Sequence, residues 1–196
     1  MMKKLYVDLD DTFKDSEKFL RKILEANGLE CPKNGSVYWR VDSSDYRPYF
    51  EMMFGNYRFI PNKEGAVENL KLLETEFEVI FCSSYINDFE AESKKKFADS
   101  LGKSIILCGG ENFDKSQVDM SDGILIDDKF EVLDASNALV KIQMYNPYNF
   151  EGISENSTLV TNWYQIVDKL MGVDVDEDLR RDFCQGIQRF HAHCGF

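Results

Sequence analysis

The sequence lacks any long hydrophobic run and is short of positive charge. No stretch of about 18 or more apolar residues occurs, so no segment is expected to span a membrane. The N-terminus, MMKKLYVDLDDT, has no apolar stretch followed by a cleavage site, so no signal peptide is expected. Lysine and arginine number 23 against 35 acids, which gives a net charge of −12. Because this charge repels phosphate backbones, the sequence argues against a nucleic-acid polymer as partner.

Regularly spaced cysteines are also missing. The five cysteines stand at irregular intervals and include no CxxC motif, so a disulfide framework is not expected. A reducing cytoplasm is therefore the predicted compartment. We interpret Cys82 and Cys108 as small buried side chains within strands. The cysteine and histidine residues near the C-terminus lack the spacing of a zinc site and are interpreted as part of a structural or frayed terminus.

Short apolar runs alternate with helical patterns along the chain. Hydrophobic residues make up 43% of the 196, enough for one compact domain with a modest insertion. Six short strands are predicted, at residues 4–9, 77–81, 105–107, 123–126, 138–142 and 158–160. Helices are predicted from a cap at Asp15 or Ser16 to a stop at Asn27-Gly28, from a cap at Asn62 to Leu73, and from a capping box at Asn87 to Leu101. Two more are predicted from a cap at Thr161 to about 170 and around 177–190. This alternation favours an α/β fold with a mainly parallel, Rossmann-like sheet flanked by helices.

Polar side chains follow three of the predicted strands. In chain order they are Asp8, Asp10, Ser83, Ser84, Asp127 and Asp128. The carboxyl ends of parallel strands lie along one edge of a sheet, which is where ligands bind in such folds. Lys115 lies in the connection before the fourth strand and can reach the same edge. The sequence therefore predicts a polar site there.

The chemistry of this set points to phosphoryl transfer. Clustered carboxylates repel one another unless a divalent cation neutralises them, and carboxylate oxygens suit Mg²⁺. A carboxylate can also attack phosphorus, and Asp8 and Asp10 face the same way because they are two residues apart in extended chain. Lysine and hydroxyl groups bind phosphoryl oxygens as charge spreads over them. A small phosphorylated substrate and a Mg²⁺ cofactor are therefore expected.

Four segments resemble, in order, the four motifs of the haloacid dehalogenase-like (HAD) superfamily. Asp8-Leu9-Asp10-Asp11-Thr12 matches the DxDx[T/V] pattern of the first motif, and Ser83 stands where the second has Ser or Thr. Lys115 fits the lysine of the third motif, and Asp127-Asp128 fits the paired acids of the fourth. DxDxT alone is a weak pattern, but four motifs in order, three of them directly after apolar strands, are specific. The resemblance covers roughly residues 4–170.

Within that superfamily the sequence looks most like the 5'(3')-deoxyribonucleotidases. Cys82-Ser83-Ser84 resembles their Cys-Thr-Ser, and Phe19-Leu20-Arg21-Lys22 resembles part of the helix after their first motif. Two positions depart from that pattern, because Asp11 stands where these enzymes usually carry glycine and Ser83 replaces threonine. The basic residue that the family carries in the helix after the second motif has no clear match, although Lys94, Lys95 and Lys96 lie near that position. Lys94-Lys95-Lys96 is interpreted as a solvated helix face.

The resemblance implies a role for each motif residue. Asp8 is expected to be the nucleophile, and Asp10 the acid and base. Mg²⁺ is expected to be bound by Asp8, by the backbone carbonyl of Asp10 and by an acid of the Asp127/Asp128 pair, with Asp128 preferred as the direct ligand. The expected phosphate-binding residues are Asp11 through its backbone N–H, Ser83, Ser84 and Lys115.

The resemblance also implies a domain division. A HAD-like core is expected at residues 1–13 and 62–171, with a small, mainly helical cap at 14–61 between the first and second motifs. A C-terminal helix and tail, residues 172–196, are expected to pack on this core, with a homodimer contact as the alternative. Eight aromatic residues lie between positions 38 and 59, and one or two of them are expected to stack on a nucleobase. The candidate substrate residues are Trp39, Arg40, Arg47, Tyr49 and Phe50.

The sequence therefore predicts a Mg²⁺-dependent hydrolase of small phosphomonoesters. The leading hypothesis is a 5'(3')-deoxyribonucleotidase that dephosphorylates (deoxy)nucleoside monophosphates through an aspartyl-phosphate. A HAD phosphatase for a sugar phosphate or a polynucleotide 3'-phosphate is an alternative, although the net charge argues against the polynucleotide. A catalytically silent HAD-like binding or regulatory module is another, although such a module has no chemical reason to keep every motif residue.

Overall fold

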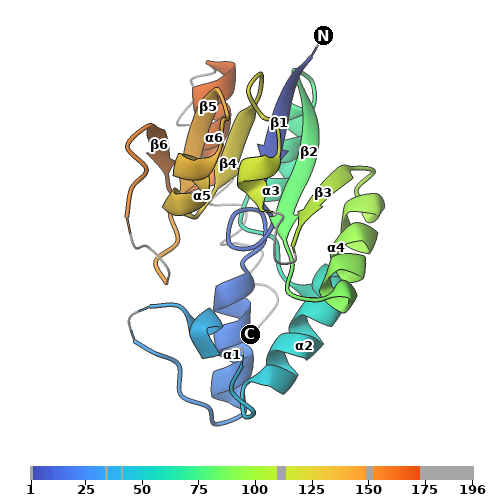
Figure 1. Cartoon of the computed structure of the whole chain (residues 1–196), viewed down its shortest axis with the longest axis vertical. Coiled ribbons are helices and arrows are strands. Elements are labelled where there is room, and N and C mark those ends of the chain that lie inside the picture. Colours follow the sequence, from blue (N-terminus) through green and yellow to red (C-terminus); the bar gives the residue numbers. More distant parts are fainter. Residues whose placement is uncertain (1, 34, 41, 110–113, 149–151, 173–196) are drawn as a thin grey trace, which may run out of the picture.

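A six-stranded parallel sheet forms the centre of the computed structural model, which describes residues 2–33, 35–40, 42–109, 114–148 and 152–172. The strands are β1 (Lys3–Val7), β2 (Phe77–Ser84), β3 (Ser104–Cys108), β4 (Ile124–Asp127), β5 (Val140–Met144) and β6 (Ser157–Val160). Their order across the sheet is β3-β2-β1-β4-β5-β6 (Figure 1). The predicted α/β class and the parallel sheet are confirmed, and each strand overlaps its predicted position.

Strand β1 shows why short apolar runs become strands here. Leu5, Tyr6 and Val7 are all buried, because both faces of a parallel sheet are covered. Leu5 and Val7 belong to the larger apolar cluster on one face, and Tyr6 belongs to a smaller cluster on the other. Val7 pairs with Phe81 of β2 on one side and with Ile126 of β4 on the other. This register brings the carboxyl ends of three strands together.

Helices cover both faces of the sheet. Helices α3 (Ala66–Leu73), α4 (Asp88–Ser100) and α6 (Trp163–Met171) contribute side chains to the larger cluster. The 3₁₀ turn η3 (Lys115–Gln117) leads into the smaller cluster, to which helix α5 (Phe130–Ala135) also contributes. Trp163 of α6 is fully buried, and its Nε1 donates to the backbone carbonyl of Thr12 at 3.0 Å. Helix α6 therefore supports the loop that follows β1.

The segment from residue 14 to 61 lies beyond the carboxyl ends of the strands (Figure 1). It contains α1 (Ser16–Ala26), η1 (Val37–Arg40), α2 (Arg47–Gly55) and η2 (Tyr57–Phe59). Leu20, Leu24 and Phe50 of this segment belong to the same apolar cluster as Leu5 and Val7 of β1. The segment thus shares a continuous core with the sheet, and its division from it as a separate domain stays a prediction.

Two helix starts can be compared with their predicted caps. Asn87 accepts the backbone N–H of Glu90, as the capping-box pattern predicts, and a carboxylate oxygen of Glu90 accepts the N–H of Ile86. Helix α6 begins after Asn162 and not after the predicted Thr161, because it is the Asn162 side chain that accepts a first-turn N–H. Both caps are therefore asparagine side chains.

Some predicted features lie elsewhere or outside the described residues. Helix α2 lies in a part of the chain where prolines and glycines interrupt the regular spacing of hydrophobic residues. Pro48 sits in its first turn, where no intrahelical N–H bond is lost. Helix α5, directly after the fourth motif, was not predicted. The helix predicted around 177–190 and the tail from 173 to 196, with its dimer contact, lie outside the described residues. Among the described helices, none is long and apolar enough to cross a membrane.

Candidate active site

The ends of β1, β2 and β4 enclose a cavity of about 420 Å³. Its lining residues are Asp8, Asp10, Asp11, Tyr38, Ser83, Ser84, Lys115, Asp127, Asp128, Lys129 and Val132. The structure therefore brings together every residue that the motifs predicted to be catalytic, phosphate-binding or metal-binding. Residues more than 100 positions apart meet there because β1 lies between β2 and β4 in the sheet.

Lys115 joins the first and fourth motifs. Its Nζ donates to Asp8 Oδ1 and, at 2.6 Å, to Asp127 Oδ2, and all three side chains are buried. Burial favours the neutral amine, but the charges of Asp127 and Asp8 outweigh it and raise the pKa of Lys115 well above its usual value. Lys115 is therefore a permanent cation at the base of the cavity.

Three buried carboxylates form a cluster around this lysine. Asp8, Asp127 and Asp128 each offer an oxygen atom, and these atoms lie within 4.8 Å of one another. Burial, with the charges of the neighbouring acids, raises the pKa of Asp8 to about 7 despite the opposing charge of Lys115. Lys115 contacts two of these carboxylates, so the cluster has more acidic groups than its one cation can neutralise, and an all-oxygen donor set is what Mg²⁺ prefers. The residues present therefore fit a divalent cation.

Asp10 is held on the side of the cavity that faces α1 and η2. Its Oδ1 accepts the hydroxyls of Ser16, at 2.7 Å, and Tyr57, at 2.9 Å. Its Oδ2 pairs with Lys94 Nζ at 2.6 Å. Burial opposes ionisation of this carboxyl, but the Lys94 charge and these hydrogen bonds prevail and lower its pKa. Asp10 is therefore an anion in this arrangement.

Lys94 corrects the interpretation of Lys94-Lys95-Lys96 as a solvated helix face. Its side chain is only 1% exposed, and its Nζ contacts Asp10, Glu90 at 2.7 Å, the carbonyl of Ser84 at 2.5 Å and the hydroxyl of Ser83 at 3.2 Å. Lys94 projects toward the site because it lies one helical turn after Glu90, which is itself buried. That four-residue spacing, on a helix that begins just after the second motif, is the sequence signal for this second cation.

Asp11 shows why glycine suits its position. Its φ is +59°, in the left-handed region that costs a residue with a Cβ roughly 1–2 kcal/mol. Its carboxylate turns toward α1 and η1, where it accepts the N–H of Glu17 at 2.9 Å and the hydroxyl of Tyr38 at 3.0 Å. Burial and the nearby charge of Asp128 raise the pKa of Asp11 well above its usual value. The carboxylate thus ties the first motif to the segment that follows α1.

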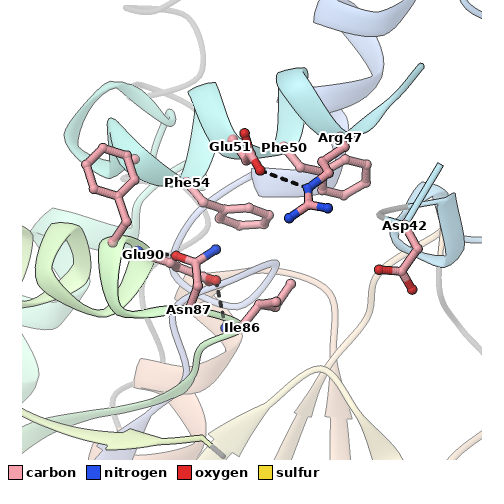
Figure 2. A pocket seen from close by; sticks show the side chains of 10 residues that line it. Asp42, Arg47, Phe50, Glu51, Phe54, Ile86, Asn87 and Glu90 are labelled. Atoms are coloured by element: carbon pink, nitrogen blue, oxygen red, sulfur yellow. Dashed lines mark hydrogen bonds and ion pairs between the residues drawn. The ribbon is translucent and has the colours of Figure 1, made fainter. Parts of the chain in front are cut away.

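Of the predicted substrate residues, the four whose side chains the structure describes do not line this cavity. Arg47 and Phe50 line a separate cavity between α2 and the start of α4 (Figure 2). Arg40 lies over the ring of Tyr46, with 5.2 Å to the ring centre. Tyr49 is half-buried against the larger apolar cluster, and the side chain of Trp39 lies outside the described part of the chain. Tyr38, which the sequence did not single out, is the aromatic residue that lines the cavity.

Comparison with known proteins identifies the fold. No family model and no curated protein matches the sequence. Among solved structures, the haloacid dehalogenase-like protein SP0104 from Streptococcus pneumoniae is 11% identical with a TM-score of 0.60, over 86% of this chain and 98% of its own. A beta-phosphoglucomutase from Thermotoga maritima is 12% identical with a TM-score of 0.60, over 88% and 100% of the two chains.

A third similar structure contains a metal ion. The HAD-hydrolase YfnB from Bacillus subtilis, bound to magnesium, is 13% identical with a TM-score of 0.56, over 86% of this chain and 98% of its own. Identities this low establish a common fold and leave substrate and activity open. The chain therefore has the fold of the haloacid dehalogenase-like hydrolases, with its four motif segments at the edge of the sheet where three strands end.

Proposed function

We propose that the protein is a Mg²⁺-dependent phosphomonoester hydrolase. The observation that carries the proposal is the buried contact of one lysine with two motif acids. Lys115 pairs with Asp8 and Asp127, and Asp128 completes the acidic cluster. A phosphate dianion needs cations around it and a nucleophile in front of it, and this cavity offers Lys115 and Asp8 for those tasks.

The residues divide the reaction into two steps. Asp8 attacks phosphorus, the bond from phosphorus to the ester oxygen breaks, and an aspartyl-phosphate forms on Asp8. Lys115 and Ser83 bind the phosphoryl oxygens as negative charge builds up on them. Water then attacks that phosphorus while Asp10 removes a proton from the water, the bond between phosphorus and the Asp8 oxygen breaks, and inorganic phosphate leaves with the Asp8 carboxylate restored. Asp8, Asp128 and the backbone carbonyl of Asp10 would hold Mg²⁺, which would neutralise part of the negative charge of the phosphate.

The contact between Lys94 and Asp10 affects the first step. The leaving alkoxide needs a proton from Asp10, and Lys94 favours the ionised form of that carboxyl. Esters whose leaving group needs little protonation, such as aryl phosphates, are therefore expected to react fastest. The ionised form suits the second step, in which Asp10 acts as a base.

For the substrate we propose a (deoxy)nucleoside monophosphate. The support is the resemblance to 5'(3')-deoxyribonucleotidases at Cys82-Ser83-Ser84 and the aromatic residues of the 14–61 segment. A sugar phosphate is the second candidate, since one of the similar structures is described as a beta-phosphoglucomutase. A panel of nucleoside monophosphates, sugar phosphates and p-nitrophenyl phosphate, with phosphate release as the readout, separates these classes.

The test of the chemistry is Asp8→Asn. This change keeps the size of the side chain but removes the nucleophilic charge, and we expect p-nitrophenyl phosphate turnover in Mg²⁺ to fall at least ~10³-fold, equivalent to about 4 kcal/mol of barrier. Asp99→Asn, the same change at an exposed residue near the end of α4, is the control and is expected to keep full activity. A tenth of wild-type turnover in Asp8→Asn would refute the nucleophile assignment. Wild-type turnover that persists in EDTA would refute the metal dependence.

A further inference from the structure

Two cysteine thiols meet at the carboxyl ends of β2 and β3. The Sγ atoms of Cys82 and Cys108 lie 4.0 Å apart, and both side chains are buried in the smaller apolar cluster. Cys82 pairs with Ile106 across the two strands and Cys108 pairs with Ser84, so the cysteines are diagonal neighbours on one face of the sheet. The sulfur atoms of a disulfide are about 2.05 Å apart, so a movement of about 2 Å would bring this pair to bonding distance.

Strand β3 can make this movement because it lies at the edge of the sheet (Figure 1). It pairs with β2 alone, and its residues Ile105, Ile106 and Leu107 are only half-buried. Elements with few buried contacts open locally at a lower free energy than the central strands do. The end of β3 can therefore shift toward Cys82 without disturbing the pairing of β1, β2 and β4.

The strand ends that carry these thiols also carry part of the candidate active site. Ser83, which lines the cavity and is assigned to the phosphoryl oxygens, directly follows Cys82. The end of β3 is tied to the same loop, because the N–H of Tyr85 donates to the carbonyl of Cys108 at 3.1 Å. A bond between the two sulfur atoms therefore pulls on the backbone that positions the Ser83 hydroxyl.

The surroundings of the pair favour oxidation by a small reagent. A hydrogen bond from Cys82 lowers the pKa of Cys108, and the charge of Lys115 lowers it further, although burial opposes both effects. The thiolate is the form of cysteine that reacts with oxidants. Both side chains are at most 1% exposed, so bulky thiol reagents are excluded and an oxidant of the size of hydrogen peroxide is required.

We propose that Cys82 and Cys108 are a redox modification site, at which hydrogen peroxide forms a disulfide that reversibly inactivates the enzyme. The effect on activity rests on the proposed phosphohydrolase function. The Cys108 sulfur bonds to one peroxide oxygen, the O–O bond breaks, and the released hydroxide takes up a proton to become water. The Cys82 sulfur then bonds to the Cys108 sulfur, the S–O bond breaks, and a second water leaves. A dithiol reductant restores both thiols by disulfide exchange and becomes a disulfide itself.

The experiment uses a variant in which Cys31, Cys184 and Cys194 are replaced by alanine, which leaves Cys82 and Cys108 as its two thiols. The folded protein is treated with a small excess of hydrogen peroxide and then with dithiothreitol. The mass of the intact protein and its turnover of p-nitrophenyl phosphate in Mg²⁺ are measured at each stage. Cys108→Ala in the same background is the matched control, because position 108 lies outside the lining of the active-site cavity. Circular dichroism checks the folding of both proteins.

We expect peroxide to lower the mass by about 2 Da, the two hydrogens lost in a disulfide, and to lower turnover at least about tenfold because Ser83 is displaced. Dithiothreitol is expected to restore both values, and Cys108→Ala to keep its turnover in peroxide. The absence of a disulfide in the folded protein, a disulfide that leaves turnover unchanged, or equal inactivation of Cys108→Ala would each overturn this inference and leave the hydrolase intact. If the reduced protein hydrolyses no phosphomonoester, the proposed function fails, and the mass alone then supports or overturns the modification site.

Discussion

Two buried lysines at this site are each paired with two carboxylates. Lys94 balances Asp10 and Glu90, and Lys115 balances Asp8 and Asp127. Buried ions of this kind contribute little net stability when every partner is present, but the loss of one partner leaves charge without compensation. Removing either of these lysines is therefore expected to lower the free energy of unfolding more than removing an exposed lysine of the same protein.

Lys94→Met is expected to lower the free energy of unfolding by about 3–5 kcal/mol, because two carboxylates then lie buried without their cation. Urea denaturation measures the change. Lys96→Met is the control on the same helix, since Lys96 and its partner Glu92 are exposed and their pair is expected to contribute less than about 1 kcal/mol. Similar losses for the two variants would contradict the role given to Lys94.

The buried Lys14 is expected to make the free energy of unfolding depend on pH. It is 2% exposed, donates to the carbonyl of Ile60 at 2.8 Å and lies 3.8 Å from the ring centre of Phe97. Burial lowers its pKa to about 8, against an ordinary value of 10.5, although the charge of Asp10 opposes this. Between these two pH values the unfolded chain binds more protons than the folded chain, so stability rises with pH in this window.

Lys14→Met removes this contribution. From pH 8 to pH 10.5 we expect the free energy of unfolding of wild type to rise, relative to that of the variant, by up to about 3 kcal/mol. Below pH 8 the difference between the two proteins is expected to be constant. Urea denaturation across this range measures both values, and other groups that titrate there cancel in the comparison. A constant difference up to pH 10.5 would show that Lys14 keeps its ordinary pKa.

At the scale of elements, the start of α4 links stability to activity. Asn87 caps the helix by accepting the N–H of Glu90, and Glu90 contacts Lys94, which holds Asp10. Asn162 caps α6 in the same way, by accepting the N–H of Gln165, but no residue of α6 is among those that line the cavity at the strand ends. The two caps therefore allow the same substitution to be compared at two places.

We expect Asn87→Ala and Asn162→Ala each to cost about 1 kcal/mol of stability, the usual value of a lost N-cap. Only Asn87→Ala is expected to reduce phosphate release, by several-fold, since it loosens the turn that carries Glu90. Thermal unfolding and steady-state turnover are measured on both variants. If Asn162→Ala lowered turnover as much, a general loss of folded protein would explain both effects.

The sequence predicted the sheet well because its signal is local. Buried parallel strands are short apolar runs, and all six stand at or near their predicted places. A mainly helical cap was expected around α2, but this helix itself was not placed, because its buried Phe50, Met53 and Phe54 stand among prolines and glycines that break the periodic pattern. Helix α5 is only six residues long, which is too short for a periodic signal.

The motif residues of the site were predicted from the sequence, whereas the contacts made by the residues around them were not. Asp8, Ser83, Lys115 and Asp127 meet because the strand order brings their loops together, and a parallel sheet implies that order in outline. The burial of Lys94 depends on how α4 packs against η2 and α2, and its four-residue spacing from Glu90 indicates only that the two side chains share one face of the helix. The hydrogen bond from Tyr38 to Asp11 likewise depends on packing, because it spans 27 residues.

At the scale of the whole molecule, stability is expected to depend on Mg²⁺. An ion that binds the folded chain alone stabilises it, by about 2.7 kcal/mol at one hundred times its dissociation constant. We therefore expect the melting temperature to rise with MgCl₂ and to fall back when EDTA is added, with NaCl of equal ionic strength as the control. Asp128→Asn, which removes one carboxylate of the cluster, is expected to shrink the rise. An undiminished rise in that variant would place the ion elsewhere.

The central place of β1 in the sheet also shapes how the chain is made. Among the strands of this sheet, β1 is synthesised first, yet its neighbours β2 and β4 begin at Phe77 and Ile124. At a synthesis rate of roughly 5–20 residues per second, the about 70 residues that separate β1 from β2 take on the order of 4–14 s to appear. During that time the apolar strand β1 is paired with neither β2 nor β4, and exposed apolar strands of this kind are what chaperones bind in nascent chains. The arrangement that gathers the motif residues at one edge therefore delays completion of the sheet until more than half of the chain has been synthesised.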